Sequence, residues 1–275
     1  MTQWQNFLRN RGEWRGSFTQ LDDQGRELDT TPSILTLQSE DNDTLVRFRL
    51  RRFADGKDAP PTQDLQQEYR TLGRQVVFFS TGAFSKGSLQ VAPFTRFGAE
   101  YGFVAPDRRL RLVQLYSESG RFASMVLIRE FRSGSAARER PPLEVEHLIG
   151  TWRGEFATIT ADWPEPSLQA SLTRVERTAP DRLRITTEAG DDHHSREGVV
   201  EGRVIECAGE TPRRIHLLAD GAASDVPLQV DHRHPFHVEA SWMVSPRERQ
   251  SLVRRYDGTG RWICSSHRVE YREES

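Results

Sequence analysis

The stretch RGEWRGSF at residues 11–18 returns in a second version, GTWRGEF, at residues 150–156. Trp152 follows Trp14 by 138 residues, which is about half of the 275-residue chain. Solenoid repeats have periods of roughly 20 to 50 residues, so a period this long predicts two whole domains of the same fold.

Two further blocks of the repeat support this interpretation. Residues 106–132, PDRRLRLVQLYSESGRFASMVLIREFR, align with residues 246–272, PRERQSLVRRYDGTGRWICSSHRVEYR, at an offset of 140 residues. Between the motifs, GAFSKGSLQV at 82–91 aligns with GAASDVPLQV at 221–230 at an offset of 139. We predict one domain over residues 1–132, a linker over 133–142 rich in Gly, Ser, Ala, Pro and charges, and a second domain over 143–275.

Strand signals dominate both repeats. Short runs of Val, Leu, Ile, Phe and Thr alternate with Gly, Asp, Asn, Ser and Pro clusters, a pattern typical of antiparallel strands. Apolar residues with helical spacing occur only at residues 2–10 and 62–72, where we expect short helices. Residues 143–149 should lead into the first strand of the second repeat. SESG at 117–120 and DGTG at 257–260 suit tight hairpins. About eight strands per repeat close into a barrel without edges, so the predicted fold is all-β, with tandem antiparallel meander barrels and short helices.

The Gly-x-Trp segments at residues 12–14 and 150–152 resemble the signature that opens the first strand of lipocalin-type, or calycin, barrels. The resemblance implies that each Trp plugs the closed end of a barrel and that an Arg beyond the last strand packs across it, a cation–π contact of about 0.5–2 kcal/mol. The residues implied in barrel closure are Trp14, Arg132, Trp152 and Arg272. Through FSTGAFSKGSLQ and FGAEYGF, the whole chain resembles two-barrel calycin-like proteins of unassigned function from cyanobacteria and plastids.

This resemblance implies a function in ligand binding. Single-barrel relatives bind hydrophobic ligands, and the related bilin lyases move open-chain tetrapyrroles onto cysteines. We therefore expect a hydrophobic or amphipathic small molecule, such as a carotenoid derivative, a tetrapyrrole or a fatty acid, which makes a pigment or lipid the implied cofactor. One alternative is a bilin lyase-like or isomerase enzyme on the same scaffold. Another is a non-catalytic assembly factor with filled barrels and a protein partner.

We expect the ligand in the first repeat. Residues 78–103 concentrate aromatic rings among small residues, and the matching segment of the second repeat has lost most of them. The alternative is that these rings fill the barrel and the glycines mark bulges. The predicted ligand-binding residues are Phe84, Phe94, Phe97, Glu100, Tyr101, Arg109 and Tyr116.

Three of these residues could also serve an enzyme. Arg109 can meet a ligand carboxylate, or it can form a cross-strand pair with Glu130 that the second repeat also retains. Glu100 stands opposite Ala240 in the alignment, which favours a role specific to the first repeat, although a solvated strand face is the commoner fate of a carboxylate. A reaction would need a titratable group, with Glu100, Arg109 and Tyr116 available.

Composition excludes several classes of function. The 38 Lys and Arg nearly balance 40 Asp and Glu, giving a net charge of −2 and no field that would attract nucleic acid. No apolar run approaches the ~18 residues that cross a bilayer, and the two cysteines do not indicate a disulfide scaffold. His232, His234 and His237 lack a carboxylate or cysteine at a familiar ligand spacing, so no metal site is predicted. We expect a cytoplasmic protein with no nucleic-acid partner and no membrane span.

Overall fold

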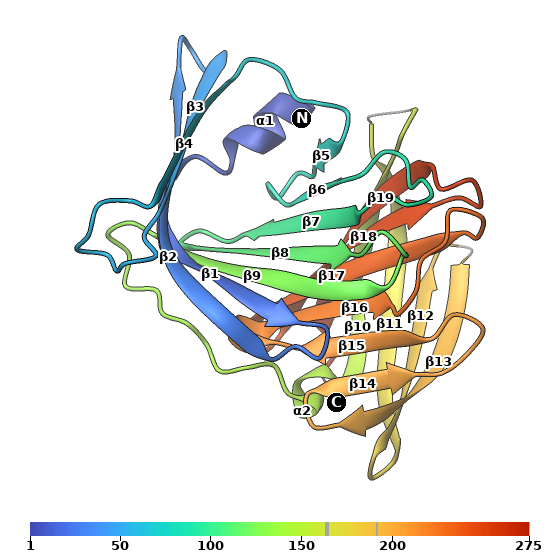
Figure 1. The fold of residues 1–275 in the computed structure, drawn as a ribbon. Coiled ribbons are helices and arrows are strands. Elements are labelled where there is room, and N and C mark those ends of the chain that lie inside the picture. Colours follow the sequence, from blue (N-terminus) through green and yellow to red (C-terminus); the bar gives the residue numbers. More distant parts are fainter. Residues whose placement is uncertain (163–164, 191, 275) are drawn as a thin grey trace.

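The two repeats form two antiparallel β-sheets in the computed structural model, which describes residues 1–162, 165–190 and 192–274. Within these residues, the first repeat is an open sheet in the order β4-β3-β2-β1-β9-β8-β7-β6-β5, and the second is a closed barrel of β10 to β19 in chain order (Figure 1). The predicted all-β tandem meander is confirmed. The first half, however, is a half-barrel.

The elements are short and almost all extended. The first sheet contains β1 (Gly12–Asp22), β2 (Glu27–Glu40), β3 (Leu45–Arg52), β4 (Gln63–Tyr69), β5 (Val76–Phe78), β6 (Phe84–Gly87), β7 (Phe97–Val104), β8 (Arg108–Tyr116) and β9 (Phe122–Arg132). The barrel contains β10 (Gly150–Thr160), β11 (Ser167–Ala179), β12 (Arg182–Ala189), β13 (Asp192–Glu201), β14 (Val204–Cys207), β15 (Arg213–Leu217), β16 (Ala222–Pro227), β17 (Phe236–Ser245), β18 (Glu248–Tyr256) and β19 (Trp262–Arg272). The helical segments are α1 (Gln3–Leu8), α2 (Val145–Leu148) and η1 (Ala219–Gly221).

Helix α1 lies where the first sheet would otherwise close. It begins with a capping box, in which Thr2 and Gln5 bond reciprocally. Its Phe7 ring packs 5.7 Å from the Tyr69 ring on β4 and 5.1 Å from the Phe78 ring on β5. The helix thus joins the two edge strands through side chains, and Figure 1 shows it inside the curve of the sheet.

The helix predicted at 62–72 is wrong. Residues 63–69 form β4, in which Leu65 lies opposite Leu50 and Tyr69 opposite Val46 of β3. The apolar residues at 65 and 69 also satisfy the two-residue period of a strand, and β3 offers a paired edge. Tertiary pairing therefore overrides a short helical pattern.

The largest apolar cluster lies between the two sheets. Its members come from both repeats and include Phe97, Tyr101 and Leu112 of the first and Val238 and Tyr256 of the second. Figure 1 shows β7, β8 and β9 lying against β16 and β17 of the barrel. The outer faces of the two sheets therefore form a common core.

A reciprocal pair of contacts fixes this sheet-on-sheet packing. Gln90 forms a β-bridge with Arg261 in the β18–β19 hairpin, and Gln229 forms one with Arg121 in the β8–β9 hairpin. Gln90 Nε2 donates to Thr259 O at 2.7 Å, and Gln229 Nε2 donates to Ser119 O at 2.6 Å. Residues 89–91 of the first repeat and 228–230 of the second, both Leu-Gln-Val, thus each bind the last hairpin of the other repeat. The interface therefore has approximate two-fold symmetry.

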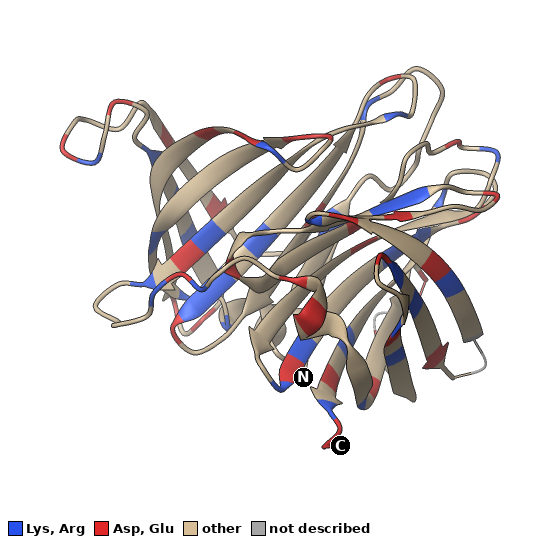
Figure 2. Cartoon of the chain, turned by 90° about the horizontal axis from the view of Figure 1, so that it is seen from below, with Lys and Arg blue, Asp and Glu red and all other residues tan. Residues whose placement is uncertain are grey.

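Charged side chains mostly pair across neighbouring strands on the outer surfaces. Arg49 of β3 bonds Asp64 of β4 at 2.7 Å, and Arg184 of β12 bonds Glu197 of β13 at 2.8 Å. Figure 2 shows basic and acidic residues next to each other on several neighbouring strands. Among the described residues, no helix is both long enough and apolar enough to cross a membrane.

Candidate functional site

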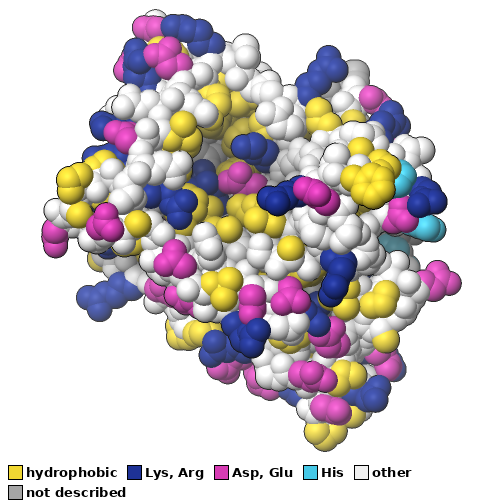
Figure 3. Space-filling view, viewed as in Figure 1, with side chains coloured by type: hydrophobic (Ala, Val, Ile, Leu, Met, Phe, Trp, Pro, Cys, Tyr) yellow, Lys and Arg dark blue, Asp and Glu magenta, His cyan; other side chains and the backbone are white. Residues whose placement is uncertain are grey.

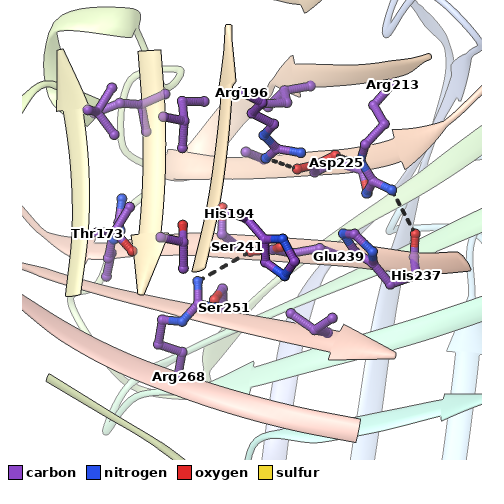
Figure 4. Close-up of a pocket in the computed structure, with 18 of the residues that line it drawn as sticks. Thr173, His194, Arg196, Arg213, Asp225, His237, Glu239, Ser241, Ser251 and Arg268 are labelled. Carbon is purple, nitrogen blue, oxygen red and sulfur yellow. Dashed lines mark hydrogen bonds and ion pairs between the residues drawn. The ribbon is translucent and has the colours of Figure 1, made fainter. Parts of the chain in front are cut away.

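The interior of the second barrel contains a cavity of about 320 Å³ (Figure 4). It lies inside the ring of β10 to β19, and exposed His194 and Ser195 line it where it meets solvent. Its volume is at the lower end of the ~300–1,000 Å³ of small-molecule sites. The cavity is therefore the strongest candidate for a binding site.

Two substitutions between the repeats create the space. Phe84 lies opposite Gly102 in the first sheet, and Ala223 lies opposite Ser241 in the barrel, so Ala223 occupies the position of Phe84. The Phe84 ring fills the first interior so closely that a Cβ on Gly102 would come within 2.0 Å of it. By the same register, Ser251 takes the position of Arg111.

Apolar side chains form the closed end of the cavity. This floor lies beside the buried Trp152 and consists of Leu143, Leu148, Val175, Ile185, Ile215, Ala223 and Met243. Leu143 and Leu148 come from the segment that leads into β10, so the chain entering the barrel also seals it. An apolar group of a ligand would be desolvated here.

The rest of the wall is strongly basic, and its Arg249 reaches the floor, 4.8 Å from the Trp152 ring centre. Five arginines and two carboxylates line the cavity, namely Arg196, Arg213, Arg249, Arg255, Arg268, Asp225 and Glu239. Asp225 lies between Arg196 and Arg213, and Arg213 Nε donates to it at 2.8 Å. Burial alone would raise the pKa of Asp225, but the two guanidinium groups outweigh it and lower the pKa below the usual range.

His237 and Glu239 add polar atoms to the same wall. Burial, together with the charge of Arg213, lowers the pKa of His237 well below its ordinary value, so the imidazole is neutral at pH 7. A neutral imidazole offers one donor and one acceptor. Figure 4 shows His237, Glu239 and Arg213 together on one side of the cavity.

The aromatic residues predicted for the first half do not enclose a cavity inside its sheet, although Phe94 and Phe97 line an open surface pocket where residues 91–97 meet residues 229–233. Phe97, Tyr101 and Tyr116 face the barrel in the core between the sheets, and the Tyr116 hydroxyl donates to Pro227 O at 3.0 Å. Phe84 packs inside the first sheet, 5.3 Å from the Phe78 ring. Phe94 is 88% exposed in a loop.

The charged residues predicted for the first half face its concave side. Arg111 binds Glu130 through two bonds of 3.0 and 3.2 Å and Glu100 through one of 3.0 Å. Arg109 lies opposite Glu130, 3.6 Å from its carboxylate, which matches the cross-strand alternative. Figure 3 shows acidic, basic and apolar groups together in the hollow of this sheet. Arg111 is thus fully engaged, whereas the buried Nε and Nη1 of Arg109 have no hydrogen-bond partner.

The alignment of Glu100 with Ala240 is wrong. Glu100 lies opposite Val113, and Glu239 lies opposite Val253, which makes Glu239 the counterpart of Glu100. A β-bulge between Met243 and Ser245 inserts one residue into the second repeat, so the offset changes from 139 to 140 only after that point. Both repeats therefore carry an inward carboxylate at this place.

The plug residues have equivalent contacts in the two repeats. Both indoles are fully buried, and each Nε1 donates at 2.9 Å to the carbonyl four residues earlier, Asn10 for Trp14 and Leu148 for Trp152. The guanidinium carbons of Arg132 and Arg272 lie 4.3 and 4.6 Å from the respective ring centres.

Sequence reasoning missed the cavity, although its signal was in the aligned blocks. Phe84 stands against Ala223 there, and Arg111 against Ser251. The loss of large side chains from the second repeat indicates space for a ligand, and not the loss of a ligand's aromatic walls.

Comparisons with known proteins agree with a two-domain chain. Residues 1–135 match the family described as "Domain of unknown function (DUF3598), N-terminal", and residues 139–273 match "Biogenesis factor required for ATP synthase 1, C-terminal domain". A crystal structure of a DUF3598-family protein with unknown function from Nostoc punctiforme is 34% identical, covers 99% of this chain and 100% of that chain, and superposes with a TM-score of 0.92.

More distant structures resemble the chain only weakly. The S-type phycobiliprotein lyase CPES from Guillardia theta is 15% identical over 47% of this chain and 90% of that chain, with a TM-score of 0.36. A putative outer membrane protein from Bacteroides fragilis is 9% identical over 99% and 100%, with a TM-score of 0.25. No curated protein was found to match the sequence.

Proposed function

The chain belongs to the DUF3598 family, and we propose that it binds an amphipathic small molecule inside its second barrel. The observation that carries this proposal is the cavity of about 320 Å³, with an apolar floor at one end and a basic, polar lining over the rest of its wall. A ligand with an apolar body and a polar group matches both parts.

The size of the cavity narrows the ligand classes. A volume of 320 Å³ corresponds to about ten water molecules at roughly 30 Å³ each. Four pyrrole rings or a carotenoid chain need considerably more space, whereas a medium-chain fatty acid is of suitable size. Of the three ligand classes expected from the sequence, this volume favours the fatty acid, and we propose the second repeat as its site in place of the first.

Filling the cavity tests the proposal. Ala223→Phe installs the side chain that the first repeat has at the equivalent position, and Ser251→Leu fills the cavity beside Arg268 without adding a charge. We expect the wild-type protein to bind decanoic acid in isothermal titration calorimetry and each variant to lose at least about tenfold in affinity. Leu168→Phe, on an exposed residue of β11, is the control and should bind as the wild type does. Equal affinity in the filled variants, or no binding by the wild type, would refute the proposal.

A second candidate function is assembly of ATP synthase. The observation that favours it is the match of residues 139–273 to the domain described as a biogenesis factor for that enzyme. Affinity purification of the full chain from its host, with ATP synthase subunits quantified by mass spectrometry, tests this function. Specific enrichment of a subunit over an unrelated bait would support it, and background levels would count against it. Ligand binding in the barrel is compatible with either result.

A further inference from the structure

The first sheet and the barrel have inward-facing arginines at different positions of their last two strands. In the first sheet Arg109 and Arg111 of β8 both face inward, and position 128 of β9, opposite Arg111, is Ile. In the barrel the equivalent of Arg111 is Ser251, and the equivalent of Ile128 is Arg268 of β19. The barrel therefore carries this arginine on another strand, in the wall of the cavity, where Figure 4 shows Arg268 directed towards Glu239.

Arg268 is also much less satisfied than its counterpart. Arg111 makes three hydrogen bonds to Glu100 and Glu130. Arg268 Nη1 lies 4.0 Å from Glu239 Oε1, too far for a hydrogen bond, and its buried Nε has no hydrogen-bond partner. The Arg268 side chain is only 14% exposed, and it borders the cavity. A buried guanidinium donor without an acceptor is costly.

The other carboxylates near the cavity are already engaged. Glu270 accepts bonds of 2.8 and 2.6 Å from Arg249 and one of 2.9 Å from Thr173. Asp225 is shared by Arg196 and Arg213. The positive charge of Arg268 is consequently the least balanced of these, because its nearest carboxylate, that of Glu239, lies 4.0 Å away. An anionic group would be attracted there, and a planar carboxylate fits the fork of a guanidinium.

We propose that Arg268 anchors the acid group of the ligand, so that the ligand class is a monocarboxylic acid with a short apolar body. This inference rests on the proposed binding function of the second barrel. The carboxylate would meet Arg268 beside Ser251 and Glu239, and the apolar body would extend to the floor formed with Leu143 and Met243. No bond is made or broken.

Two probe ligands with the same ten-carbon alkyl chain test whether Arg268 anchors the acid group. Decanoic acid and decanol differ in the charged head, and the wild type should bind decanoate at least about tenfold more tightly at pH 7.5. Arg268→Ile, which copies Ile128 of the first repeat, should remove this preference by weakening decanoate and leaving decanol unchanged. Arg174→Ile on the outer face of β11 loses the same charge outside the cavity and is the control.

A loss of affinity in Arg268→Ile could also result from misfolding, so a second variant is chosen that should gain affinity. Glu239→Gln removes the carboxylate nearest to Arg268 and should strengthen decanoate binding several-fold, again without effect on decanol. If the wild type binds both probes equally, or if both cavity variants keep its preference, the anchor is refuted and the proposed function stands. If neither probe binds, the proposed function fails and the anchor fails with it.

Discussion

Buried histidines should make the folding stability of this protein depend on pH, although its total charge is nearly balanced. His267 of β19 packs against the Phe79 ring at 5.3 Å, and its Nε2 lies 3.1 Å from Gln250 Oε1. Burial lowers the pKa of His267 to about 3. His216 and His237 are shifted in the same direction, with burial as the main cause. These residues are neutral in the folded protein and take up protons more readily once it unfolds.

The sign of the effect follows from this shift. Between pH 6.5 and about 3 the unfolded chain binds a proton at His267 that the folded chain does not, so stability falls as the pH falls through that window. His267→Gln keeps a polar partner for Gln250 but cannot titrate. From pH 7 to pH 5 the variant should lose about 2 kcal/mol less stability than the wild type, at about 1.4 kcal/mol per pKa unit.

Urea unfolding at the two pH values measures this difference. His234→Gln, on an exposed residue, is the control and should leave the pH dependence as it is in the wild type. An unchanged difference between pH 7 and pH 5 in His267→Gln would show that other groups dominate the acid response.

At the scale of a strand, the glycine that follows Trp-Arg explains why the opening motif is repeated. Gly16 of β1 lies opposite Glu130 of β9, and Gly154 of β10 lies opposite Glu270 of β19. A Cβ on Gly16 would come within 1.8 Å of Arg129 O, and one on Gly154 within 1.9 Å of Val269 O. The first and last strands approach too closely there for any side chain.

This close approach makes both glycines sensitive to the smallest substitution. Gly16→Ala and Gly154→Ala should each destabilise the protein by about 1–3 kcal/mol or more, because the clash is with backbone that cannot rotate away. Gly258→Ala is the matched control, since the nearest atom to its Cβ would be 3.6 Å away. Chemical denaturation of the three variants provides the measurement. Equal stability of Gly154→Ala and Gly258→Ala would contradict this account of the motif.

The sequence predicted those elements that the repeat itself encodes. The hairpins at 117–120 and 257–260 form as expected, each with a positive-φ glycine, Gly120 and Gly260. The inward face was harder to predict, because a one-residue slip reverses it and the bulge near Met243 produces such a slip. That bulge misaligned Glu100. The closure of a sheet is not encoded locally either, so the open first half could not be distinguished from the closed second.

At the scale of the molecule, the two halves act as partners in one interface. Tyr116 of β8 donates to Pro227 O at 3.0 Å, and Tyr256 of β18 donates to Ser88 O at 2.8 Å, so the same hydroxyl crosses the interface in each direction. Tyr101 adds a third bond, to Val238 O at 2.9 Å. The segments that align most clearly are those that make this interface, which explains why residues 82–91 and 221–230 stayed alike while the interiors diverged.

Removing the three hydroxyls tests whether this interface holds the halves in one cooperative unit. Each of Tyr101→Phe, Tyr116→Phe and Tyr256→Phe should cost about 1–2 kcal/mol. The first two remove the hydroxyl donor of Val238 O and Pro227 O, and the third removes the acceptor of the buried Arg254 Nε. The triple variant should melt roughly 10 °C below the wild type, at about 2–4 °C per kcal/mol for a chain of this size. Calorimetry should give a single transition for the wild type, since the largest apolar cluster spans both repeats. Tyr69→Phe, whose hydroxyl bonds Gln67 within the first sheet, should change the melting temperature little. Two separate transitions in the wild type, or an unchanged melting temperature in the triple variant, would mean that each half is stable without the other.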